Sequence, residues 1–169
     1  MDNEIRSEDE AFYKYVTGVD SAREGEDQLI ERALAIIEGR WVEPMYVMEN
    51  PDTVKNYLRL KLAALEYEVF AVLFLDNRHR VIDFQEMFRG TVDGASVWPR
   101  EILKEALKVN AAAVILAHNH PSGVVIPSKA DKRITERVSE ALALISVRTL
   151  DHILVGGVEA YSFSEAGLI

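Results

Sequence analysis

The pattern of apolar and polar positions divides the chain into helical and extended segments. Between residues 26 and 38, apolar side chains recur every three or four positions, which predicts a helix ending at Gly39. The sequence Asn-Pro-Asp at residues 50–52 opens a second predicted helix. Its apolar face carries Val54, Tyr57, Leu58, Leu62 and Leu65. Residues 11–16 could form a shorter helix, and residues 44–48 are a candidate strand.

Two nearly uninterrupted apolar runs, residues 69–75 and 111–117, are typical of buried strands. Asp76 and Asn77 supply a turn after the first run, so residues 80–84 are predicted to return as the second strand of a hairpin. Short segments follow at residues 88–91 and 96–98. Two last strands, near residues 152–155 and 160–163, flank a pair of glycines.

Two further helices are predicted, one on each side of the second apolar run. The first begins at Pro99, because proline suits the first helical position, and the second begins at Ser128. The residues expected to point inward are Ile102, Leu103, Ala106 and Leu107 in the first helix and Ile134, Val138, Ala141 and Ile145 in the second. Helices and strands alternate loosely, so the fold class is α/β with a mixed sheet flanked by helices.

Charge separates an acidic N-terminal part from the rest of the chain. The net charge is −9, and residues 1–50, with 13 acidic and 5 basic side chains, contribute −8 of it. We therefore divide the chain into an acidic tail and helix, residues 1–44, and one domain, residues 45–169. Nucleic-acid binders usually carry a strong basic surface, so direct nucleic-acid binding by this chain alone is expected to be weak or absent.

The chain contains no cysteine, which excludes disulfides, cysteine nucleophiles and thiolate zinc sites. No apolar run approaches the roughly 18 residues of a membrane span, and the acidic N-terminus is unlike a secretory signal. We expect a cytoplasmic protein without membrane contact. The oligomeric state is left open by the sequence.

Metal-binding residue types cluster directly after the second apolar run. His118 and His120 are two residues apart in an extended segment, so their side chains point to the same side. Asp131 begins the next helix, where Ser128 and Asp131 also form a capping pattern. An H-x-H pair alone is often a turn or surface pair. The full string H-N-H-P-S-G-x-x-x-P-S-x-x-D, running from a buried strand into a helix, is far more specific.

Three protein ligands leave one tetrahedral position of a metal ion open for water. His and carboxylate donors without cysteine favour a catalytic Zn²⁺ over a structural one. Such a site needs a general base that is not itself a ligand. Glu68, at the start of the first apolar run, is the candidate; the alternative is a polar residue that merely starts a strand.

These motifs resemble the JAMM (MPN-type) metalloproteases and, more closely, the bacterial RadC family. His118, His120, Pro121, Ser128 and Asp131 match the JAMM pattern position by position, and the hallmarks H-N-H-P-S-G and P-S-x-x-D of the RadC family are both present. The resemblance covers about residues 45–169. It implies a JAMM/MPN-like architecture, layered as in cytidine deaminases.

The resemblance also implies roles for individual residues. His118, His120 and Asp131 would bind zinc, Glu68 would act as acid and base, and Ser128 would help to polarise the scissile carbonyl. The implied activity is hydrolysis of peptide or isopeptide bonds in a protein or peptide substrate. The chain departs from the pattern in two ways: Asn119 stands where isopeptidase members usually have Ser or Thr, and no clear helix-hairpin-helix region precedes the domain.

Other functions remain open or are disfavoured by the sequence. The RadC family name implies a DNA-repair accessory protein in which the domain binds a partner or nucleic acid and catalysis is secondary. A zinc nucleobase deaminase is disfavoured, because its P-C-x-x-C ligand motif requires cysteine.

Three weaker features are also interpreted from the sequence. His79 is expected to be solvated, and His152, beside Asp151, is either a strand histidine or a support for the metal site. A locally basic helix, which is usually a solvated face, could also receive an acidic or phosphate-bearing partner; its cationic residues are Lys129, Lys132, Arg133 and Arg137.

Overall fold

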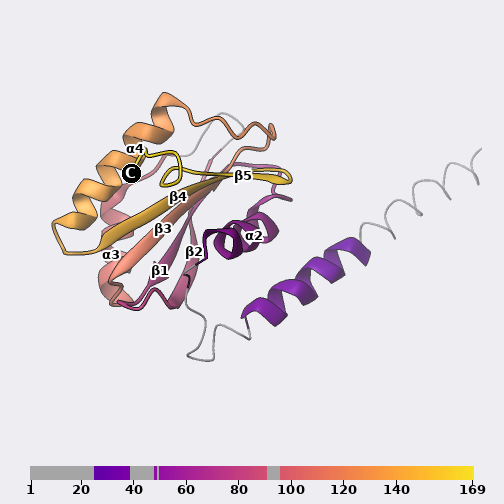
Figure 1. Cartoon of the computed structure of the whole chain (residues 1–169), viewed down its shortest axis with the longest axis horizontal. Helices are drawn as coiled ribbons and strands as arrows, with labels where there is room; N and C mark the ends of the chain where they lie inside the picture. Colours follow the sequence, from indigo (N-terminus) through magenta and orange to yellow (C-terminus); the bar gives the residue numbers. More distant parts are fainter. Residues whose placement is uncertain (1–24, 39–47, 49, 91–95) are drawn as a thin grey trace, which may run out of the picture. The chain divides into compact units, whose positions relative to one another are not determined.

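The computed structural model describes residues 25–38, 48, 50–90 and 96–169. The chain forms two compact units, residues 1–39 and 40–169. In the first unit, the structure describes one helix over residues 25–38, which confirms the helix predicted there (Figure 1). The predictions for residues 11–16, Gly39 and residues 44–47 lie outside the described residues, and Met48 is not in a strand.

The second unit is built on one five-stranded mixed sheet, in the order β2-β1-β3-β4-β5. Its strands are β1 (Val69–Leu75), β2 (Val81–Arg89), β3 (Ala113–Asn119), β4 (Arg148–Gly156) and β5 (Glu159–Ser162). Only β3 and β4 pair in parallel; every other neighbouring pair is antiparallel. The α/β class and the central position of the two apolar runs are thereby confirmed.

The first hairpin differs in length from its prediction. Asp76 shapes the turn, since its carboxylate accepts the amides of Arg78 and Arg80 at 2.8 and 2.9 Å. The returning strand β2 runs to Arg89, whereas the sequence predicted a strand of residues 80–84 and a separate segment from residue 88. β2 is an edge strand with half-buried or exposed side chains throughout, so it lacks the apolar signal of a buried strand.

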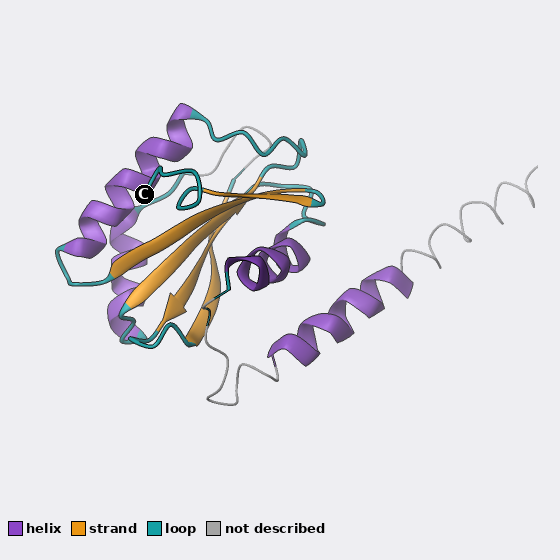
Figure 2. Ribbon diagram, viewed as in Figure 1, coloured by secondary structure: helices purple, strands orange, loops and turns teal. Residues whose placement is uncertain are grey.

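Helices cover both faces of the sheet (Figure 2). α2 (Pro51–Leu62) contacts β3, β4 and β5, whereas α3 (Pro99–Lys108) and α4 (Lys129–Ala143) pack against each other on the opposite side. The buried side chains on that side come from β1 (Phe70, Val72, Phe74), β3 (Val114, Leu116), α3 (Ile102, Ala106) and α4 (Val138, Leu142). Among the helices that the structure describes, none is long and apolar enough to cross a bilayer.

Three details of the predicted helix faces were wrong or incomplete. Leu107 in α3 is 61% exposed, and Leu65 lies beyond the end of α2. In α4, the fully enclosed residues include Thr135 and Leu142, which were not predicted to be buried. The remaining helix starts agree with the sequence: Pro51 and Pro99 begin α2 and α3, and Ser128 is the N-cap of α4.

Candidate metal centre

The side chains of His118 and His120 project to the same side at the C-terminal end of β3. β3 extends through Asn119, so His118 is still paired in the sheet, opposite Phe70 of β1, and is only 2% exposed. The amide of His120 donates to the carbonyl of Val155 at 2.8 Å, which continues the parallel contact with β4. The two Nε2 atoms lie 3.2 Å apart, as the two-residue spacing predicts.

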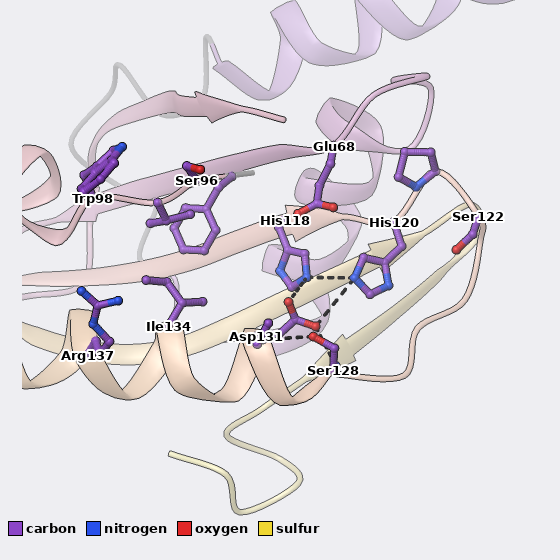
Figure 3. A pocket seen from close by; sticks show the side chains of 14 residues that line it. Glu68, Ser96, Trp98, His118, His120, Ser122, Ser128, Asp131, Ile134 and Arg137 are labelled. Atoms are coloured by element: carbon purple, nitrogen blue, oxygen red, sulfur yellow. Dashed lines mark hydrogen bonds and ion pairs between the residues drawn. The ribbon is translucent and has the colours of Figure 1, made fainter. Parts of the chain in front are cut away.

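Asp131 reaches the two histidines from the first turn of α4. Ser128 and Asp131 form a capping box: the Ser128 amide donates to Asp131 Oδ2 at 2.6 Å, and the Asp131 amide donates to Ser128 Oγ at 3.1 Å. This fixes the carboxylate, whose Oδ1 is 3.4 Å from His118 Nε2 and whose Oδ2 is 3.8 Å from His120 Nε2 (Figure 3). The structure thus brings all three predicted ligands together.

The donor atoms of the three residues lie close enough together to bind one metal ion. Two ligand atoms about 2.0–2.1 Å from zinc lie about 3.3 Å from each other when the geometry is tetrahedral. The two Nε2 atoms lie 3.2 Å apart, and each is near a different oxygen of Asp131, at 3.4 Å for His118 and 3.8 Å for His120. One atom from each residue can be chosen so that all lie within 4.8 Å of one another. The donor set of two imidazoles and one carboxylate leaves one position for a water or a substrate.

The electrostatics of Asp131 also suit a metal ligand. Burial alone would raise the pKa of this carboxyl group. The neighbouring His118 and the hydrogen bonds from Ser128 outweigh burial and hold the pKa of Asp131 well below its usual range. The carboxylate is therefore ionised at neutral pH and ready to bind a cation.

Glu68 lies beside the three residues, in the same cavity of about 580 Å³. It directly precedes β1, and its carbonyl accepts the amide of Gly90 at 2.8 Å. Figure 3 shows its carboxylate pointing toward His118 and His120 from the side opposite Asp131. Ser128 also lines the cavity. Both residues therefore lie where their predicted roles require, and those roles remain predictions.

Comparison with known proteins identifies the family of this domain. The family model of the RadC-like JAB domain matches residues 48–168. The chain belongs to the RadC-like JAB domain family. The resemblance seen in the sequence is thereby confirmed at the level of the family.

Relatives of this RadC-like JAB domain carry names that state no activity. A UPF0758 protein of Vibrio cholerae is 56% identical over 147 residues, which are 87% of this chain and 92% of that protein. A UPF0758 protein of Leptothrix cholodnii is 50% identical over 162 residues, covering 95% of this chain and 72% of that protein. A third, from Nitrosococcus oceani, is 63% identical over 123 residues, but these are only 55% of its length.

Asn119 connects the JAB-domain histidines to the segment that carries Glu68. Its side-chain Oδ1 accepts the amide of Val69 at 2.8 Å, and its Nδ2 donates to the carbonyl of Tyr67 at 3.0 Å. Because these groups flank Glu68 on both sides, the Asn119 side chain fixes the backbone from which the carboxylate projects. The sequence identified Asn119 only as a departure from the isopeptidase pattern; this contact was missed.

His152 contacts the centre directly, and its neighbour Asp151 does not. The His152 ring is fully buried, with Nε2 2.8 Å from His118 Nδ1 and Nδ1 2.6 Å from Thr135 Oγ1. Burial, with a smaller contribution from the neighbouring His118, lowers the pKa of His152 well below its ordinary value. The Asp151 carboxylate instead accepts the amides of His152 and Ser164 at 2.7 and 2.9 Å. Of the two sequence interpretations, the structure favours support of the metal site.

The remaining predicted features lie at the edges of the domain. His79 is half-buried rather than fully solvated, and its Nε2 is 3.3 Å from the guanidinium of Arg148. The four cationic residues of the basic helix are exposed, as expected for a solvated face. Arg137 is the only one of the four among the residues that line the cavity.

Gly156 lies under the loop that orients His120. The His120 Nδ1 is 2.7 Å from the carbonyl of Val124, so this nitrogen must donate and Nε2 keeps its lone pair for a metal. A Cβ at Gly156 would lie 2.6 Å from the Gly123 oxygen and 2.7 Å from Val125 Cγ1. The loop can therefore keep its path only while position 156 has no side chain.

Gly156→Ala is accordingly expected to weaken zinc binding about tenfold without removing a ligand, because it displaces the loop that orients His120. Competition with a chromophoric chelator measures the affinity. Gly157→Ala is the matched control: its φ is +56° and nothing lies within 4 Å, so it should cost about 1–2 kcal/mol of stability and leave zinc affinity unchanged. Equal zinc affinity in the two folded variants would contradict the prediction.

Proposed function

We propose that this chain is a zinc-dependent hydrolase that cleaves peptide or isopeptide bonds. The observation that carries the proposal is that one potential ligand atom from each of His118, His120 and Asp131 lies within 4.8 Å of the others, so that the three could share one zinc ion and leave a position for water. The three residues line a cavity into which the Glu68 carboxylate also points. Membership of the JAB domain family supports the reaction class but names no substrate.

The metal ion and Glu68 have separate roles in the proposed reaction. A bound zinc ion would polarise the scissile carbonyl and lower the pKa of a water molecule to near neutrality. Glu68 accepts the proton from the attacking water and delivers it to the nitrogen of the leaving amine. One water is consumed, the amide C–N bond breaks, and a carboxylic acid and an amine are released.

Ser128 is suited to assist by hydrogen bonding. Its Oγ already accepts the amide of Asp131, so the hydroxyl proton is available to donate to another acceptor. A substrate carbonyl in the cavity would be such an acceptor, and the donation would stabilise negative charge that develops on its oxygen. In this proposal Ser128 therefore both caps α4 and contacts the substrate.

The proposal is tested with fluorogenic peptides and isopeptide-linked lysine substrates. We expect turnover by the zinc-loaded protein, loss of turnover when a chelator removes the metal, and recovery when zinc is restored. Metal content is measured on the same sample. A fully zinc-loaded protein that cleaves neither class of bond would overturn the proposal.

A phosphate-bearing partner is the second candidate, because Arg137 lines the cavity and exposed Lys132 and Arg133 lie on the same helix. With a net charge of −9, we expect only weak DNA binding that disappears as salt is raised. The test is a titration with duplex and single-stranded DNA at about 0.15 M salt. The variant Lys132→Gln/Arg133→Gln, which lacks two of these helix cations, is the control for DNA contacts made through this helix. Tight, salt-resistant binding by the intact chain would favour the DNA-repair role over hydrolysis of protein.

A further inference from the structure

Four groups form a continuous hydrogen-bonded chain behind the metal ligands. The Thr135 hydroxyl donates to the carbonyl of Asp131 at 2.6 Å and lies 2.6 Å from His152 Nδ1. His152 Nε2 in turn lies 2.8 Å from His118 Nδ1. Thr135, His152 and His118 are 3%, 0% and 2% exposed, so water does not compete for these groups. The chain joins the backbone of one ligand to the ring of another.

The donor and acceptor of each of these hydrogen bonds follow from the first group in the series, the Asp131 carbonyl. A carbonyl oxygen can only accept, so the single proton of the Thr135 hydroxyl is directed to Asp131. The reverse assignment would set two oxygen lone pairs 2.6 Å apart. Thr135 Oγ1 must therefore accept from His152, which places the His152 proton on Nδ1.

The remaining steps follow in the same way. A neutral imidazole has one N–H, so His152 Nε2 is an acceptor and His118 Nδ1 must be the donor. His118 then keeps the lone pair on Nε2, the nitrogen that faces His120 and Asp131. The rings of Phe70 and Phe163 pack against His152, with centroids 5.4 and 4.7 Å away.

We infer that His152, oriented by Thr135, is a positioning residue that holds His118 in the one tautomer able to bind a metal through Nε2. The inference rests on the proposed metal site, but it concerns hydrogen bonds within the protein itself and applies to the zinc-free protein when both imidazole rings are neutral. Such partners of metal-binding histidines typically change metal affinity 10- to 100-fold when they are lost.

The test compares zinc affinity among folded variants of the full chain. His152→Phe keeps a ring but removes the acceptor, and Thr135→Val keeps the shape but removes the hydroxyl; each should weaken zinc binding about 10- to 100-fold. His152→Gln places an amide oxygen near the former Nε2 and should recover most of the affinity. Phe163→Leu is the control, because it disturbs the packing of the same ring without removing a hydrogen bond.

A spectroscopic measurement separates this inference from the proposed function. In the zinc-free wild type, at a pH high enough for both rings to be neutral, ¹⁵N chemical shifts should show protonated Nδ1 and unprotonated Nε2 for both His118 and His152. Finding His118 protonated on Nε2 would overturn the inference, even if His152→Phe did not fold. So would wild-type zinc affinity in Thr135→Val. A wild type with the expected tautomers that binds no zinc would overturn only the proposed metal site.

Discussion

Replacing His118 or Asp131 with alanine is expected to remove most of the zinc from the purified protein, which should otherwise hold about one ion per chain. Each substitution deletes one of three ligands, so the loss of affinity should exceed the roughly 10- to 100-fold effect of a supporting residue. Elemental analysis of dialysed protein measures the stoichiometry, and competition with a chelator measures the affinity.

Controls for this prediction are available within the same chain. His79→Ala removes a histidine from the turn between β1 and β2, and Lys132→Ala removes an exposed side chain next to Asp131. Both should retain wild-type zinc content. If His118→Ala or Asp131→Ala also retained it, the assigned ligands would be wrong.

Glu68→Gln is expected to keep the metal and lower turnover by about 10²- to 10⁴-fold, the usual contribution of a general acid–base. The amide has nearly the shape of the carboxylate but cannot accept the proton of the attacking water. Turnover is measured with whichever peptide or isopeptide substrate the zinc-loaded wild type cleaves, and metal content is measured in parallel.

Glu66→Gln is the matched control, because Glu66 lies two residues earlier, is exposed and does not line the cavity. It should leave both zinc content and turnover unchanged. A Glu68→Gln protein that turned over at the wild-type rate would remove Glu68 from the mechanism. Loss of zinc in that variant would instead indicate that Glu68 helps to bind the metal.

The sequence predicted the centre of the fold better than its edges. β1 and β3 are buried along their whole length, so an apolar run identified each of them directly. β2 is half-buried and contains Asp83, Gln85 and Glu86, so only its first residues followed the hairpin pattern. Leu107 illustrates the same limit in a helix: an apolar residue on the edge of a helical face can remain exposed when nothing packs over it.

The site divides in a similar way between local and distant contacts. The two histidines lie at the end of one strand, and Asp131 is held by a capping box with Ser128, three residues earlier. Local spacing was therefore sufficient to identify all three residues. His152 meets His118 because β4 pairs in parallel with β3, and Thr135 reaches His152 from α4, the helix that connects these two strands. No local pattern encodes that pairing. The hydrogen bonds of Asn119 likewise span about fifty residues of sequence.

The antiparallel register of β1 and β3 has a consequence for how the centre is assembled. Phe70 lies opposite His118, and the same register continued by two residues would set Glu68 opposite His120. Glu68 and His120 thus lie at the same end of the ladder, where Asn119 makes a hydrogen bond to the amide of Val69. Fraying of this corner would separate them in a single event, while the rest of the sheet stays folded. The free energy of that local opening, rather than that of global unfolding, then sets the fraction of molecules in which Glu68 and His120 are close together. Any ligand that binds only the closed corner increases that fraction by mass action.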